Sequence, residues 1–298
     1  MREKSKKWLS PPDSSTNHNI ARKAHHKGTA SWFFQSRIYE EWKSSPSFLW
    51  IHGKRTLLSF LLPQTPPTPI FAAGSGKSVL WFVLSFFCRL HLLRLFPSSG
   101  IIEDIMAQRE AESSIVAYFY CDFRDEDKQN CRNLVLSIIS QLCAQSTLCC
   151  DILSRIYLAH DEGARKPSDE TLTKCLTEMV SLPFPGPIYL VLDALDECPN
   201  NSGLPTPREE VLDLVNDLVG LSLPKLHICV TSRPEIDIQT ILEPLTSLCV
   251  SLHNQTGQKE DIVDYVTSVV HSDRKIRRWR EEDKKLVIEV LSERADGM

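Results

Sequence analysis

The residues best suited to chemistry form the string GSGKS, which comprises Gly74, Ser75, Gly76, Lys77 and Ser78. Its glycines allow backbone N–H groups to approach phosphate oxygens, and a helix that begins here adds a favourable dipole. Lys77 would bridge the β- and γ-phosphates of a nucleoside triphosphate, and the Ser78 hydroxyl would bind Mg²⁺. The string predicts a phosphate-binding loop. The other interpretation is an ordinary loop, because short Gly-Ser-Lys strings also occur without a ligand.

The phosphate-loop pattern is incomplete. Its full form requires a glycine five positions before Gly76, and that position holds Phe71. The predicted strand that should lead into the loop, residues 48–52 followed by Gly53, lies upstream, with 22 residues (54–75) where about four are expected. Either the additional proline-rich residues bulge out and the loop closes over them, or the nucleotide site is deformed.

A second set of candidate residues follows two other apolar runs. The run IYLVL ends at Asp193, which would hold the Mg²⁺ shell, and Asp196 or Glu197 could orient an attacking water. Arg233 follows the run HICVTS and is placed to contact a γ-phosphate. The competing interpretations are a solvated acidic turn after the first run and a surface turn ended by Pro234 after the second.

These residues need a scaffold, and the apolar patterns predict one. Continuous apolar runs, typical of parallel strands covered on both faces, lie at 48–52, 115–121, 188–192, 226–230 and 248–252. Helical spacing of apolar residues is found at 32–42, 101–111, 130–145, 168–181 and 209–221. Strands that alternate with helices predict an α/β fold with a mostly parallel central sheet.

Composition limits the classes of function. The 298 residues are 42% hydrophobic and 24% charged, enough for one main domain with flanking segments. A net charge of −4 gives no basic field, so neither nucleic acid nor an anionic membrane is a predicted partner. The ten cysteines are scattered and lack zinc-site spacing, which predicts free thiols in a reducing compartment. The N-terminus lacks the apolar part of a secretory signal, which predicts a cytoplasmic location.

One apolar segment, residues 79–96, is long enough to raise the question of a membrane span. It contains Arg89, His91 and Arg94, and charges near the middle of a span are costly in a bilayer. We therefore expect a buried helix that follows the phosphate-binding loop, with a transmembrane helix as the less favoured alternative.

Taken together, the strings SFLWIHGK, AGSGKSVL, VAYFYCDFRDEDKQ, YLVLDALDEC and HICVTSRPE resemble the NACHT-type NTPase domains of fungal STAND proteins, also called nephrocystin-like N-terminal domains. The resemblance implies a three-layer P-loop NTPase of the STAND/AAA type that binds ATP or GTP with Mg²⁺. It further implies a signalling switch that forms oligomers through this domain. Residues 8–34 resemble the stretch that commonly precedes the domain.

The resemblance divides the chain into a polar leader or linker (1–30), the NTPase domain (31–253) and a charged helical segment (254–298). Insertions near 55–72 and 81–99 interrupt the domain, and the chain ends where the family would continue into a winged-helix region and repeats. Two hypotheses follow: a nucleotide switch with slow or impaired NTP hydrolysis, and a degenerate scaffold or interaction fragment that binds no nucleotide. A P-loop kinase is a weaker third hypothesis, because no acceptor site or lid is evident.

Overall fold

The computed structural model describes residues 2–24, 30–53, 98–201, 203–252, 256–272 and 276–295. The predicted phosphate-binding loop at 73–78, the proline-rich residues 63–69 and the apolar segment 79–96 lie outside these residues. The first predicted insertion does so too. Of the second, only Ser98 and Ser99 are described, and both are buried at the start of helix α7 (Ser98–Glu112).

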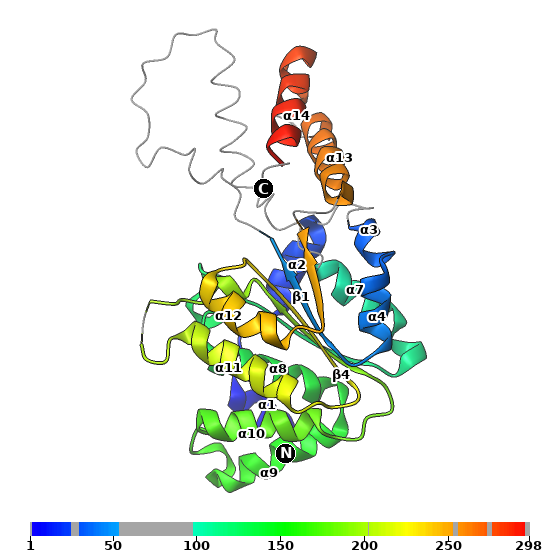
Figure 1. Cartoon of the computed structure of the whole chain (residues 1–298). Coiled ribbons are helices and arrows are strands. Elements are labelled where there is room, and N and C mark those ends of the chain that lie inside the picture. The colour runs from blue at the N-terminus through cyan, green and yellow to red at the C-terminus, as the bar shows by residue number, and fades with distance from the viewer. Residues whose placement is uncertain are drawn as a thin grey trace, which may run out of the picture.

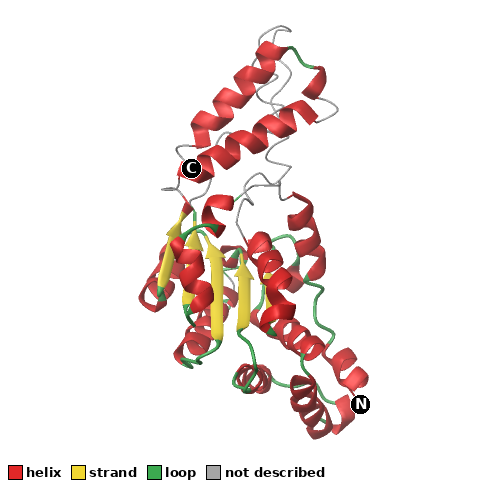
Figure 2. Cartoon of the chain, turned by 90° about the vertical axis from the view of Figure 1, so that its right-hand side faces the viewer, coloured by secondary structure: helices red, strands yellow, loops and turns green. Residues whose placement is uncertain are grey.

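The centre of the fold is a sheet of five strands, all parallel, in the order β2-β3-β4-β1-β5. In chain order the strands are β1 (Phe48–His52), β2 (Ile115–Tyr120), β3 (Ile188–Asp193), β4 (Leu226–Ser232) and β5 (Leu248–Ser251). The arrowheads in Figure 2 point the same way, so the carboxyl ends of the strands share one edge. The predicted α/β class with a parallel sheet is confirmed.

Helices cover both faces of the sheet, which gives three layers (Figure 1). Alternate strand residues face opposite layers: Phe48 and Trp50 belong to one hydrophobic core, and Leu49 and Ile51 to the other. The first core is covered by α1 (Arg2–Leu9), α8 (Cys131–Gln145), α9 (Thr147–Ala159), α10 (Asp169–Val180), α11 (Pro207–Gly220) and α12 (Ile236–Leu245). The second is covered by α2 (Ser15–Ala24), α3 (Ser31–Phe34), α4 (Arg37–Ser44) and α7.

Local capping explains where several helices begin. The Ser168 side chain accepts a hydrogen bond from the Thr171 N–H at the start of α10, as its position in the sequence predicts. The single helix predicted at 32–42 is wrong in one respect, because it is divided into α3 and α4. α3 ends at Phe34, and Ser36, which has an extended backbone, accepts from the Tyr39 N–H and so caps the start of α4.

The residues expected to form a leader are helical and contact the domain. Leu9 of α1 is buried in the first core, and Ala21 of α2 packs against the second. Beyond β5, the segment predicted to be charged and helical contains α13 (Thr256–Ser272) and α14 (Glu281–Ala295), which pack against each other. None of the helices within the described ranges is long and apolar enough to cross a membrane.

Candidate functional site

The tip of β3 is fixed by a threonine on the neighbouring strand. The Thr231 hydroxyl donates to Asp193 Oδ1 over 2.7 Å, and the Thr231 hydroxyl oxygen accepts from the Ala194 N–H over 2.9 Å. Asp193 is 4% exposed and Thr231 is fully buried. Ala194 has a left-handed backbone (φ 56°), which turns the chain away from the strand. The Asp193 carboxylate is thus held in one orientation at the carboxyl edge, with an oxygen ligand of the kind that Mg²⁺ prefers.

Two predicted site residues contact each other. The backbone N–H of Arg233 donates to Asp196 Oδ1 over 3.0 Å, and its side-chain Nε lies 3.1 Å from Asp196 Oδ2. Burial raises the pKa of the Asp196 carboxyl, and the Arg233 charge opposes that rise. Both carboxylate oxygens are therefore engaged by the residue expected to contact a γ-phosphate.

Glu197 turns toward the opposite side of β3. Its Oε2 accepts a 3.2 Å hydrogen bond from the Phe123 N–H, which belongs to the loop after β2. That loop is joined to β3 directly as well, because the Cys121 N–H donates to the Asp193 carbonyl over 2.9 Å. Asp196 and Glu197, which share one predicted role in the sequence, thus have different surroundings. Asp196 pairs with an arginine, whereas Glu197 is oriented by a backbone N–H.

Arg208 is a site-supporting residue that the sequence does not reveal. Its guanidinium is buried and donates to the carbonyls of Asp196 (2.6 Å) and Cys198 (3.0 Å). It also contacts Glu235 Oε2 at 2.6 Å and Asp237 Oδ2 at 3.1 Å. A single side chain on α11 therefore joins the loop after β3 to the start of α12. No motif marks it, since an arginine in the first turn of a helix is usually exposed.

The strand expected to feed the phosphate-binding loop lies beside this cluster. β1 pairs with β4 up to His52 and Ser232, and the Gly53 N–H donates to the Ser232 carbonyl over 3.3 Å. Gly53 is the last described residue before the predicted loop. The structure brings Asp193, Asp196, Glu197 and Arg233 together at one edge; the predicted loop residues Gly74, Ser75, Gly76, Lys77 and Ser78 lie outside the described residues.

A sequence model of the family described as Nephrocystin 3, N-terminal, matches residues 71–233, which is more than half of the chain. The chain belongs to the nephrocystin 3 N-terminal family. The region that matches the family contains the GSGKS string and strands β2, β3 and β4, and its last residue is Arg233. No curated protein matches the chain.

The family match therefore contains every residue proposed from the sequence for phosphate, metal and water. It leaves out β1, which precedes the proline-rich residues, and the N-terminal helices α1 and α2. The structure joins both of these to the matched region: β1 pairs with β4, and α2 packs against α7.

Proposed function

We propose that the chain is a nucleotide-binding switch module of the NACHT and STAND type, which binds ATP or GTP with Mg²⁺ and hydrolyses it slowly. The observation that carries the proposal is the buried Asp193 carboxylate, held by Thr231 at the carboxyl edge of a parallel sheet. Ligands of open α/β sheets bind at that edge. The GSGKS string, within the same family match, supplies the residue types that bind phosphate.

Each residue then has one task. The backbone of Gly74, Ser75 and Gly76 would surround the phosphates, and Lys77 would neutralise the β- and γ-phosphates. Ser78 and Asp193 would hold Mg²⁺, which neutralises charge on the triphosphate when bound. Oδ1 of Asp193 accepts from Thr231, whereas Oδ2 has no partner among the residues that the structure describes, so Oδ2 is the oxygen assigned to the metal shell.

The same geometry supports the slow hydrolysis that we propose. Glu197 is the better candidate to orient water, because the Phe123 N–H orients its carboxylate, whereas both oxygens of Asp196 contact Arg233. Arg233 Nε is engaged by Asp196, so in this proposal a γ-phosphate competes with that carboxylate for the guanidinium. Breaking this pair exposes a buried carboxylate, and that cost would have to be offset by contacts with the triphosphate.

Binding of Mg-ATP and Mg-GTP to the full chain, measured by titration calorimetry, tests the proposal. We expect Lys77→Ala to weaken binding at least tenfold, about 1.4 kcal/mol, because the ammonium loses its contacts with two phosphates. We expect Asp193→Asn to weaken binding in Mg²⁺ but to change little in EDTA, since only the metal-linked part of the affinity is removed. Arg155→Ala, on the exposed surface of α9, is a control expected to bind like the wild type.

The alternative is a scaffold that retains the sheet and binds no nucleotide. The 22 residues between Gly53 and Gly76 favour it, because they separate β1 from the loop that it should position. Negligible binding by both the wild type and Lys77→Ala would support this alternative. A further part of the proposal is self-association through residues 31–253. Light scattering with and without Mg-nucleotide measures it, and an unchanged mass in both conditions would argue against it.

A further inference from the structure

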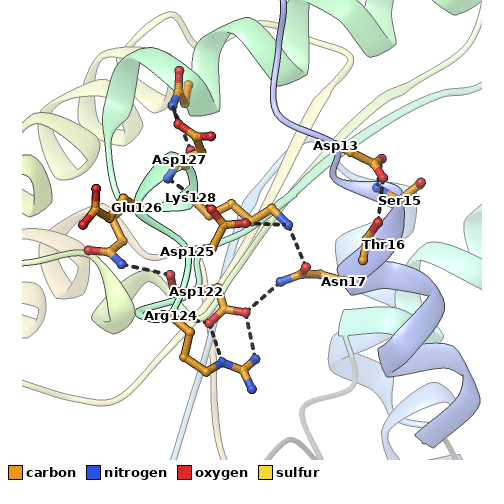
Figure 3. Close-up of polar contacts among 12 residues, drawn as sticks. Asp13, Ser15, Thr16, Asn17, Asp122, Arg124, Asp125, Glu126, Asp127 and Lys128 are labelled. Atoms are coloured by element: carbon orange, nitrogen blue, oxygen red, sulfur yellow. Dashed lines mark hydrogen bonds and ion pairs between the residues drawn. The ribbon is translucent and has the colours of Figure 1, made fainter.

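A buried polar cluster joins the N-terminal helix α2 to the loop after β2 (Figure 3). Asn17 Nδ2 donates to Asp122 Oδ2 over 3.2 Å, and Lys128 Nζ donates to Asn17 Oδ1 over 2.8 Å. The three residues are 5–6% exposed. Figure 3 shows the Asn17 amide lying between the carboxylate and the ammonium. This arrangement uses the donor and the acceptor end of the amide at once, so the amide is oriented by opposite charges.

Further contacts within the loop hold Asp122 and Lys128. Arg124 donates from Nε to Asp122 Oδ1 and from a terminal nitrogen to Asp122 Oδ2, each over 2.8 Å. Lys128 Nζ also lies 3.3 Å from Asp125 Oδ2. The backbone closes the loop, because the Asp122 N–H donates to the Lys128 carbonyl over 3.4 Å. Residues 121–128 therefore form one hydrogen-bonded unit, and Asn17 links it to α2.

This unit reaches the candidate site through its own backbone. Phe123, next to Asp122, donates its N–H to Glu197 Oε2 over 3.2 Å, and Cys121 donates its N–H to the Asp193 carbonyl. A shift of the loop by less than an ångström would lengthen the Phe123 bond beyond hydrogen-bond range. Asn17, which lies 180 positions before Glu197 in the chain, is thus linked to it through Asp122 and the Phe123 N–H.

We propose that Asn17 is a positioning residue for nucleotide hydrolysis, acting through Asp122 and the Phe123 N–H to orient Glu197. The inference rests on the function proposed above and adds a means of regulation. Helix α2 is part of the hydrolytic unit, so an event that undocks it slows hydrolysis without releasing the nucleotide. Binding of the triphosphate depends on Lys77 and Ser78, which the cluster does not touch in the proposed scheme.

A second contact keeps α2 in place when Asn17 is replaced. His18 lies 5% exposed between the Tyr120 hydroxyl (3.0 Å from Nδ1) and Glu103 Oε1 (2.9 Å from Nε2). These partners belong to β2 and α7, whereas Asn17 contacts the loop after β2. Asn17→Ala therefore removes the link to the loop and leaves the helix docked.

The test compares Asn17→Ala with Thr16→Ala in the full chain. Thr16 Oγ1 donates to Asp13 Oδ2 over 2.6 Å, so Thr16→Ala weakens the start of the same helix without touching the loop. For Asn17→Ala we expect kcat for Mg-ATP or Mg-GTP to fall about tenfold or more, because misplacement of a water-orienting group is costly. We expect the nucleotide Kd to stay within about twofold. Thr16→Ala should leave both quantities unchanged.

Hydrogen exchange of the nucleotide-free proteins supplies a second measurement. We expect faster exchange in residues 121–130 and 195–198 of Asn17→Ala, and faster exchange confined to α2 in Thr16→Ala. An unchanged kcat in Asn17→Ala, or unchanged exchange at 195–198, would overturn the proposal, as would equal losses of kcat and affinity. If the wild type binds no nucleotide, the proposed function fails, and the exchange comparison alone decides whether Asn17 positions the Glu197 segment.

Discussion

Replacing Thr231 by valine separates the shape of this residue from its hydroxyl. Valine has nearly the same volume, so the substitution leaves the packing of β4 intact and removes one oxygen. That oxygen donates to Asp193 over 2.7 Å and accepts from the Ala194 N–H over 2.9 Å. Thr231 is fully buried, so water cannot readily replace either bond.

The cost follows from the two bonds. A hydrogen bond to a charged group contributes about 1.5–3 kcal/mol, and a buried N–H left without an acceptor costs about 1–3 kcal/mol. The two effects share one atom and overlap, so we expect Thr231→Val to lower the free energy of unfolding by about 2–4 kcal/mol. The corresponding fall in Tm is roughly 5–10 °C. Urea unfolding followed by circular dichroism measures the first quantity, and calorimetry the second.

Thr231→Ser is the matched control, because it keeps the hydroxyl and deletes only a methyl group. Its expected cost is about 1 kcal/mol, from the buried methyl alone. Equal destabilisation by valine and serine would refute the reasoning, since the hydroxyl would then contribute nothing beyond its volume. If Asp193 binds Mg²⁺ as proposed, valine also weakens Mg-nucleotide binding more than serine does.

Three further perturbations address other parts of the fold. Arg208→Met should lower the free energy of unfolding by about 3 kcal/mol, because two carbonyls and two carboxylates lose a buried donor. Arg208→Lys should restore only part of this free energy, and chemical denaturation measures both variants. Burial raises the pKa of Asp196 above its ordinary 3.8, so the folded state holds this proton more tightly than the unfolded state. The free energy of unfolding contributed by Asp196 is therefore largest below pH 3.8, and it falls as the pH rises from 3.8 to the raised pKa of the folded state. Urea unfolding midpoints measured across this pH range should show the fall in the wild type and lack it in Asp196→Asn. Gly163→Ala should cost about 1–2 kcal/mol, because φ is +87° and a Cβ would lie 2.5 Å from Tyr157, and it should leave nucleotide binding unchanged.

The strands could be predicted because each is a continuous apolar run, and only their ends differ. β3 extends by one residue to Asp193 and β4 by two to Ser232, since the backbone continues to pair after the side chains become polar. The sequence patterns do not predict helix α12, which contains Pro244, a residue that normally breaks helices. Hydrophobic periodicity detects the buried part of an element. It does not predict a turn between two helices that is set by a capping residue such as Ser36.

The supports of the site could not be predicted for a related reason. Asn17 and His18 lie in a stretch that composition describes as polar, yet they are 6% and 5% exposed. Their burial is compensated by partners more than 80 positions away in the chain, and no local pattern contains that information. Arg208 is similar, because its acceptors are mostly backbone carbonyls and loop carboxylates that come together only in the folded sheet.

The segment from Asp193 to Cys198 is held by polar groups from three other elements: the Thr231 side chain of β4, the Arg208 side chain of α11, and the Phe123 N–H in the loop after β2. Buried polar contacts of this kind are costly unless each partner is satisfied, and apolar residues of similar volume often serve stability as well or better. A sheet kept only as an inert scaffold would gain little from holding six residues so closely. The arrangement therefore favours a working acidic tip, in which the exact orientation of a carboxylate matters, over a relic in which only its burial would matter.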